Sequence, residues 1–248
     1  MRYFLACGES GAEKKFLSAM SDQDPVFAGI FQGVLEKGDV FVSFLRSVPP
    51  VTGPDLSVAA VLKRESSGYV SSGEVFQDRI FTSVPFAAEY LRIRFPESEI
   101  NVLTADECAG MTDEGTVIVP ESEVSGFQGK ILDPDLILPA PGQGAVSVIC
   151  RKDDRETAEL CRKINHNPSR IETGAERGIA RLSGLHDNLG IRAETEDMFL
   201  HVRALSITGS GIREADEYIP PDYVMDDLLG IAEYLSWKRD YIVRGAVL

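Results

Sequence analysis

A glutamine and an arginine stand out in the segment from Leu136 to Arg151, which reads LILPAPGQGAVSVICR. The amide of Gln143 can donate and accept hydrogen bonds, and the guanidinium of Arg151 can pair with a carboxylate. The prolines and glycines around Gln143 restrict or relax the backbone, so they predict a tight turn of defined shape. The apolar run from Ala145 to Cys150 predicts a covered strand that ends at Arg151. We therefore expect Arg151 to face a cleft, with an ordinary strand connection as the alternative.

The net charge of the chain argues against two classes of partner. The 248 residues include 25 basic and 39 acidic side chains, a formal net charge of −14. Such a surface repels nucleic acid and anionic lipid, so neither is expected as a partner. A hydrophobic content of 44% is ordinary for a globular protein with a good core. The longest apolar runs are only a few residues long, so no membrane span is expected.

The cysteines and histidines do not indicate a metal site. No two cysteines form a CxxC pair, and no histidine stands at ligand spacing from any of them. We expect free, mostly buried thiols in a reducing compartment. The apolar segment from Met1 to Cys7 is too short for a signal peptide and predicts a first strand, so the expected location is the cytoplasm. The four cysteines are Cys7, Cys108, Cys150 and Cys161.

Helices and strands are predicted along the whole chain. Apolar residues recur with helical spacing between Phe27 and Leu35, which predicts an amphipathic helix there. Residues 65–75 are rich in Ser and Gly and predict a crossover between domains. Further helices are expected at 13–20, 86–95, 154–165, 169–181 and 222–238, and strands at 39–45, 56–62, 99–103, 116–119, 145–150 and 199–208.

Three stretches follow the motifs and the order of one known family. Residues 139–151 match PA-x-GQGA-x-x-x-x-C-R, and residues 39–49, DVFVSFLRSVP, line up without a gap on D-I-A-V-H-S-L-K-D-L-P. Residues 153–181 are similar to DD…LNH…AERAFLR. The chain therefore resembles porphobilinogen deaminase, also called hydroxymethylbilane synthase, over about residues 26–205.

The resemblance implies an α/β fold with two periplasmic-binding-protein-like lobes, a crossover hinge and a small C-terminal α/β domain. The first lobe would comprise residues 1–72 and 137–152, the second lobe 73–136, and the C-terminal domain 153–248. Glu176 and Arg177 retain an E-R pair of the family, and we expect them to form an ion pair that anchors the third domain.

The resemblance also implies chemistry. The family grows a chain of pyrroles on a dipyrromethane cofactor, which a thioether attaches to a cysteine, while an aspartate assists at the pyrrole nitrogens. Ser47 occupies the position of that acid. A hydroxyl can bond a pyrrole N–H but has no charge to stabilise a developing cation, and losing such a preorganised group typically costs ~10²–10³ in rate.

The cofactor cysteine also has no counterpart. Its position falls on Leu185, or on His186 if the gap is placed differently, and neither side chain can form a thioether. No cysteine follows Cys161, which we interpret as a core residue. We therefore expect no dipyrromethane cofactor.

Most of the basic residues that would hold carboxylates are also missing. The family's T-S-S-L-R-R aligns on residues 82–87, so Thr82 and Ser83 are retained, while Phe86 and Ala87 replace both arginines. Arg46 keeps the positive charge of a family lysine. Binding an acetate- and propionate-bearing pyrrole chain needs many such charges.

The sequence thus predicts a degenerate member of this family, linked to tetrapyrrole biosynthesis, that does not assemble hydroxymethylbilane by the cofactor-primed route. It could bind a small anion or pyrrole in the cleft between the lobes, or act as a partner of a tetrapyrrole-pathway enzyme. The alternatives are an active hydroxymethylbilane synthase with substitute residues and a generic two-lobed small-molecule binder. The candidate ligand-binding residues are Arg46, Ser47, Thr82, Ser83, Gln143 and Arg151.

Overall fold

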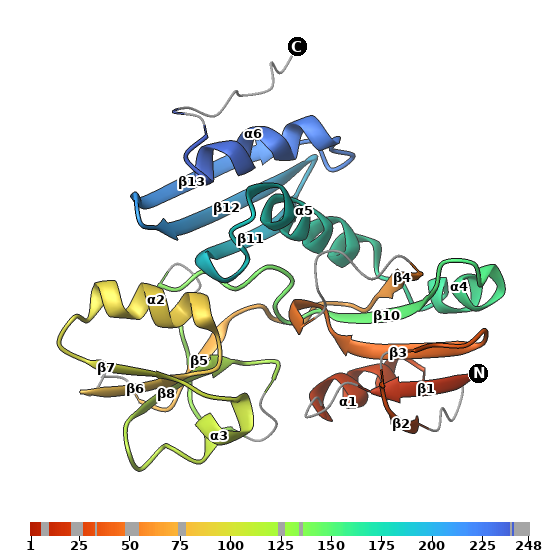
Figure 1. The fold of residues 1–248 in the computed structure, drawn as a ribbon, viewed down its shortest axis with the longest axis horizontal. Helices are drawn as coiled ribbons and strands as arrows, with labels where there is room; N and C mark the ends of the chain where they lie inside the picture. Colours follow the sequence, from red (N-terminus) through yellow and green to blue (C-terminus); the bar gives the residue numbers. More distant parts are fainter. Residues whose placement is uncertain are drawn as a thin grey trace. The chain divides into compact units, whose positions relative to one another are not determined.

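A computed structural model describes residues 1–5, 10–20, 27–32, 34–47, 55–73, 78–123, 127–133, 136–238 and 240 (Figure 1). The chain is mixed α/β, and its contacts divide it into two compact units. Unit 1 comprises Met1–Ser66 and Gly144–Arg170, and unit 2 comprises Ser67–Gln143 and Ile171–Leu248. The three-part division drawn from the family resemblance stays a prediction.

Unit 1 is built on a five-stranded sheet with the order β2-β1-β3-β10-β4. The first three of these strands are parallel, and β10 runs antiparallel to both of its neighbours. Tyr3, Val42 and Val148 meet Phe16 of α1 and Cys161 of α4 in its core. The elements are β1 (Arg2–Leu5), α1 (Ser10–Ala19), β2 (Phe27–Ile30), β3 (Asp39–Phe44), η1 (Leu45–Ser47), β4 (Leu56–Val61), β10 (Val146–Arg151) and α4 (Arg155–Arg162).

The prediction of a helix between Phe27 and Leu35 is wrong. Phe27–Ile30 forms strand β2, which pairs in parallel with β1. The aromatic ring of Phe27 packs against those of Tyr3 and Phe16, and Phe31 stacks on Phe41 with ring centroids 4.3 Å apart. The apolar spacing therefore serves contacts with distant strands, which outweigh the weak local preference for a helix.

The first sheet of unit 2 repeats the strand arrangement of unit 1. Its strand order is β7-β6-β8-β5-β9. The parallel strands β7, β6 and β8 correspond in position to β2, β1 and β3 of unit 1, and the antiparallel strand β5 corresponds to β10. Residues 65–75 thus contain strand β5 rather than only a connection. The elements are β5 (Tyr69–Ser71), β6 (Arg79–Thr82), α2 (Pro85–Arg94), β7 (Glu99–Val102), α3 (Ala105–Ala109), β8 (Thr116–Pro120) and β9 (Lys130–Ile131).

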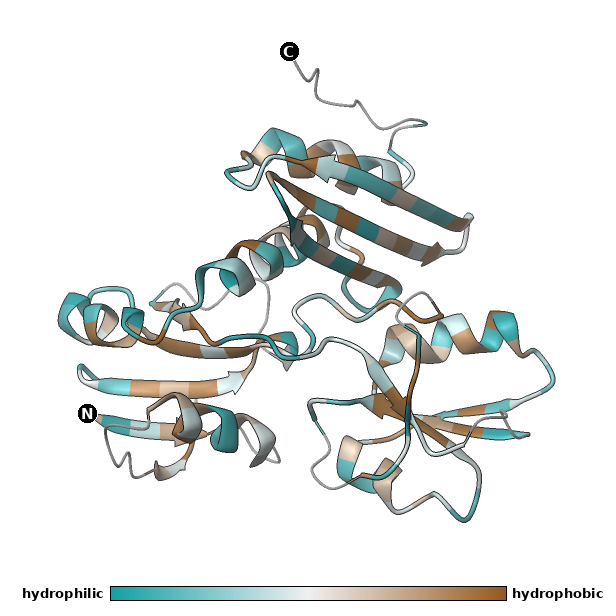
Figure 2. Cartoon of the chain, turned by 180° about the vertical axis from the view of Figure 1, so that it is seen from behind, coloured by the Kyte–Doolittle hydropathy of each residue, from teal (hydrophilic) through white to brown (hydrophobic). Residues whose placement is uncertain are grey.

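A second sheet of unit 2 is a three-stranded antiparallel meander, β11-β12-β13. Its strands alternate between hydrophobic and hydrophilic residues (Figure 2). Leu200, Val202 and Ala204 face a core shared with α5 and α6, so the side chains between them lie on the opposite face. The elements are α5 (Asn167–Ser183), η2 (His186–Asn188), β11 (Leu189–Glu196), β12 (Phe199–Thr208), β13 (Gly211–Ile219) and α6 (Met225–Leu235).

The other predicted helices and strands are confirmed to within a few residues at their ends, and strand 199–208 is found with the expected bounds. Additional elements that the sequence patterns did not predict are β6, β9, α3, β11 and β13. Across the described ranges, no helix is both long and apolar enough to cross a membrane.

Candidate functional site

Two candidate residues follow the carboxyl end of β3. Arg46 and Ser47 form part of the short 3-10 helix η1, and Arg46 is half-buried. Ligands of open α/β sheets bind outside the carboxyl ends of parallel strands, and β3 runs parallel to β1. The position of Arg46 therefore suits contact with an anionic ligand.

Arg151 lies at the opposite edge of the same sheet, which corrects the expectation that it shares a cleft with Arg46. Strand β10 runs antiparallel to β3, with Val146 opposite Phe44 and Ile149 opposite Phe41. The end of β10, which carries Arg151, is therefore near the start of β3. The end of β3, which Arg46 follows, lies about the length of a six-residue strand away (~17–20 Å). The Arg151 guanidinium donates two hydrogen bonds to the Asp153 carboxylate, at 2.8 and 3.1 Å.

In unit 2, Thr82 and Ser83 join β6 to helix α2. Thr82 is buried, and its hydroxyl oxygen accepts a hydrogen bond from the backbone N–H of Val84 at 3.4 Å. The Ser83 hydroxyl oxygen is buried without a hydrogen-bond partner in the described structure. Val84 is the N-cap of α2 and offers no side-chain acceptor, so the first N–H groups of the helix lack a side-chain cap. This corner can therefore accept an anion or another hydrogen-bonding group.

The two positions at which the family has arginines belong to the hydrophobic core. Phe86 is 1% exposed and Ala87 is fully buried, and both pack with Ile80 and Leu91. They stabilise the attachment of α2 to its sheet. Neither side chain has a charged group that could pair with a carboxylate.

Gln143 shapes the turn in which it stands. Its side chain is fully buried, its Oε1 accepts from the Ala140 N–H at 3.2 Å, and its Nε2 donates to the Ser67 carbonyl at 2.7 Å. Gly142 and Gly144 flank it with φ values of 78° and 81°, in the left-handed region that favours glycine. The amide thus ties the turn to the start of unit 2.

Glu176 holds the same turn from the other side. Its buried carboxylate accepts one hydrogen bond from the Gly142 N–H at 2.8 Å and another from the Ala193 N–H at 3.0 Å. Helix α5, the turn and strand β11 therefore meet at one charged group. Burial lowers the pKa of the neighbouring Arg177.

The position of the family's cofactor cysteine does not fit a thioether-linked group. Leu185 is half-buried against the core of the three-stranded sheet β11-β12-β13, called the C-terminal sheet below, and His186 is exposed. Cys161 is buried, and burial raises the pKa of its thiol to about 12. A thioether requires an accessible thiolate, and none of these three side chains supplies one.

The sequence also predicts the absence of a metal site. Within the described ranges, no three His, Cys, Asp or Glu side chains gather as metal ligands would. Cys7 lies outside the described residues.

The fold therefore defines a mixed α/β protein in which Arg46 and Ser83 follow parallel strands. The chain is 28% identical over 231 residues to the probable porphobilinogen deaminase of Nitrosopumilus maritimus. That alignment covers 79% of this chain and 74% of that protein. The probable porphobilinogen deaminase of Methanosarcina barkeri is 28% identical over 235 residues, 82% of this chain and 72% of that protein. The probable porphobilinogen deaminase of Methanocaldococcus jannaschii is 28% identical over 158 residues. That alignment covers 56% of this chain and 53% of that protein.

No protein-family model matches the chain. The similarity to curated relatives nevertheless confirms the resemblance predicted from the motifs, and the chain is a divergent relative of porphobilinogen deaminases.

The sequence did not reveal what Glu176 does. A signal was present, because Thr173, Glu176 and Ala180 recur at i, i+3 and i+7 on one buried face of α5. A carboxylate on such a face requires hydrogen-bond donors from elsewhere in the fold. Which donors supply them depends on tertiary structure.

Proposed function

We propose that this chain takes part in tetrapyrrole metabolism without assembling hydroxymethylbilane by the dipyrromethane-primed route. The observation that carries the proposal is the cofactor position, where Leu185 packs into a core and no cysteine follows Cys161 in the sequence. A thioether cannot form from a leucine or a histidine, and the fully buried clamp positions support the same conclusion. The link to tetrapyrroles rests on the names of the relatives.

The ligand we propose is a small anion or a carboxylate-bearing pyrrole. Each unit offers one candidate contact. In unit 1, Arg46 would supply a positive charge after β3. In unit 2, the uncapped start of α2 and the Ser83 hydroxyl would supply hydrogen-bond donors. The motif alignment suggests that the residue at position 47 contacts a pyrrole N–H; the Ser47 side chain lies outside the described part of the structure. The repeated strand order of the two five-stranded sheets supports the proposal that each sheet belongs to a periplasmic-binding-protein-like lobe.

A second candidate function is an active hydroxymethylbilane synthase that uses substitute residues. It is favoured by the similarity to proteins named porphobilinogen deaminase over as much as 82% of the chain. Service as a partner of another pathway enzyme is compatible with the first proposal, because it requires no catalysis.

Intact-mass spectrometry and product analysis test the proposal. The purified full chain is incubated with porphobilinogen; we expect no mass increase from attached pyrrole units and no hydroxymethylbilane. A covalent dipyrrole, or turnover near that of an authentic deaminase assayed in parallel, would establish the second function.

Thermal unfolding with porphobilinogen tests ligand binding separately. A ligand that binds the folded state raises its stability, so we expect a concentration-dependent increase in Tm. Arg46→Gln should reduce the increase, whereas Arg155→Gln, which removes the same charge from the exposed start of α4, should leave it unchanged. Equal responses of both variants would count against Arg46 as a ligand contact.

A further inference from the structure

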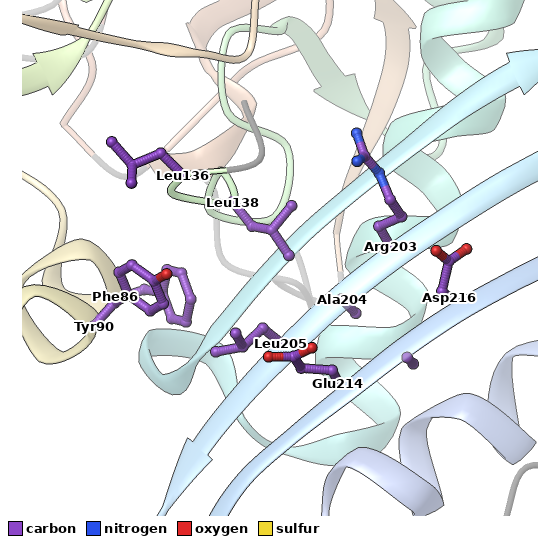
Figure 3. Close-up of a pocket in the computed structure, with 10 residues that line it drawn as sticks. Phe86, Tyr90, Leu136, Leu138, Arg203, Ala204, Leu205, Glu214 and Asp216 are labelled. Carbon is purple, nitrogen blue, oxygen red and sulfur yellow. The ribbon is translucent and has the colours of Figure 1, made fainter. Parts of the chain in front are cut away.

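A pocket of about 250 Å³ lies within unit 2, beside α2 and the outer face of the C-terminal sheet (Figure 3). None of the candidate ligand-binding residues predicted from the sequence is among those that line it. Its volume lies just below the range of typical small-molecule sites, which begins at ~300 Å³, so it suits a small ligand. The lining residues that matter are Phe86, Tyr90, Leu136, Leu138, Arg203 and Glu214.

Close packing fixes the two sides of this pocket relative to each other. A Cβ atom on Gly190 would lie only 2.2 Å from a ring carbon of Phe86. Strand β11 can therefore approach α2 this closely only because residue 190 is a glycine. The Ile191 N–H donates to the Pro139 carbonyl at 2.7 Å. Leu205 of β12 belongs to the same hydrophobic cluster as Phe86. The pocket is therefore preformed within one packed unit.

One wall of the pocket is apolar. The rings of Phe86 and Tyr90 stack with centroids 6.3 Å apart, and the half-buried side chains of Leu136 and Leu138 continue this wall. Leu205 extends it on the sheet, as Figure 3 shows. Such a surface suits an aromatic or branched aliphatic group.

The other wall is charged. Adjacent strands place Glu214 opposite Leu205, and Asp216 opposite Arg203. The Asp216 carboxylate also bonds the His201 imidazole at 2.6 Å, so this group already has a partner. The exposed Glu214 side chain makes no hydrogen bond or ion pair with any residue in the described part of the chain. One carboxylate beside the apolar wall is thus open to a ligand.

We propose that this pocket binds a small organic cation, a primary amine or similar group attached to an aromatic or branched aliphatic body. The body would lie against Phe86, Tyr90 and Leu138, and the cation would pair with Glu214. The open Glu214 carboxylate would repel an anion of the same shape. This binding is independent of the function proposed above.

The test compares two probes that differ mainly in charge. 2-Phenylethylammonium and 3-phenylpropionate are titrated into the full chain, whose leucine methyl groups are isotopically labelled and followed by NMR. We expect saturable shifts at Leu136, Leu138 and Leu205 with the ammonium compound and much weaker binding of the carboxylate. Preferential binding of 3-phenylpropionate, or shifts only outside this pocket, would overturn the proposal.

A pair of matched variants tests the role of Glu214. Glu214→Gln keeps the shape of an exposed side chain, so the fold should be retained, and a melting curve checks this. We expect 2-phenylethylammonium binding to weaken about threefold to fivefold, as an exposed ion pair allows. Glu156→Gln removes the same charge from α4 and should change nothing. An undiminished affinity of Glu214→Gln would refute the assigned contact.

Discussion

Glu176 joins three segments of unit 2 through one side chain. The two N–H groups that it accepts come from Gly142 and Ala193, which are 34 and 17 residues away in the sequence. Hydrogen bonds to a charged, buried acceptor are stronger than neutral ones, and a buried N–H without an acceptor is costly. The geometry of the glycine-rich turn therefore depends on this carboxylate.

Replacing Glu176 should destabilise the protein strongly. Glu176→Ala leaves both N–H groups without an acceptor, and we expect the free energy of unfolding to fall by about 3 kcal/mol or more. Glu176→Gln retains one acceptor and should lose roughly half as much. Urea unfolding measures both, with the exposed Glu156→Ala as a control that stays within ~0.5 kcal/mol. A Glu176→Ala variant as stable as this control would show that the turn does not need the carboxylate.

His201 lies on the outer face of the C-terminal sheet, and its protonation makes the stability of the protein depend on pH. Burial lowers its pKa, but hydrogen bonds to Asp216 and Glu196 outweigh burial and raise the pKa above its ordinary value of 6.5. The ring also stacks on Tyr218, with centroids 4.3 Å apart.

The sign of this dependence follows from the raised pKa. The protonated imidazole is favoured in the folded state, so its contribution is complete below pH 6.5 and is lost as the pH rises through the folded-state pKa. We expect His201→Gln to remove this part of the pH dependence of urea unfolding. His186→Gln, at an exposed position, should leave the dependence intact. An unchanged pH profile in His201→Gln would contradict the assignment.

At the scale of elements, helix α4 is held by the residue that caps its N-terminus, Asp154. The Asp154 carboxylate accepts hydrogen bonds from the Thr157 N–H at 3.1 Å and the Thr157 hydroxyl at 2.7 Å. It also accepts one from the Gly38 N–H at 2.6 Å, just before β3. This last bond contributes most to lowering the pKa of Asp154. The cap therefore joins α4 to the central strands of unit 1.

Removing this cap should weaken unit 1. We expect Asp154→Ala to cost at least ~2 kcal/mol, because a cap is worth ~1 kcal/mol and the Gly38 N–H also loses its acceptor. The contribution is present above the ordinary carboxyl pKa of 3.8 and is lost as the pH falls through the lower folded-state value. Denaturant unfolding at neutral and acidic pH measures it. Asp113→Ala, at an exposed turn, is the control, and an equal effect of both would disprove the role of the cap.

At the scale of the whole molecule, the cysteines report on separate cores. Cys108 packs with Phe81 and Val117 in unit 2, whereas Cys150 and Cys161 share a core in unit 1. Burial raises the pKa of Cys108 to about 11 and that of Cys161 to about 12. All three thiols should therefore resist reagents in the folded protein.

Thiol labelling can show whether the two units unfold together. In a Cys7→Ser background, we expect no labelling of the native protein and labelling of three thiols after unfolding. Because the cores are distinct, Cys108 should become reactive at a different denaturant concentration from Cys150 and Cys161. Peptide mass spectrometry distinguishes them. Simultaneous labelling of all three would mean that the units unfold as one.

Local patterns in the sequence were sufficient for several elements and for the family. The periodic segments at 86–95, 154–165 and 222–238 form helices, since each has an apolar face that local spacing reveals. The glycine-rich turn was predicted because Pro139 restricts the backbone angle φ and Gly142 permits angles that other residues resist. The motifs led to porphobilinogen deaminases, and the curated relatives confirm that resemblance.

Only the tertiary structure decided where the candidate residues lie. Arg151 is on the opposite sheet edge from Arg46 because β10 pairs antiparallel with β3, about a hundred residues earlier in the chain. Phe27 lies in a strand because its ring meets those of Tyr3 and Phe16. Glu176 has its role because Gly142 and Ala193 converge on it. Spacing along the chain reports which neighbours share a face, whereas strand direction, partner and burial come from contacts between segments that the sequence keeps far apart.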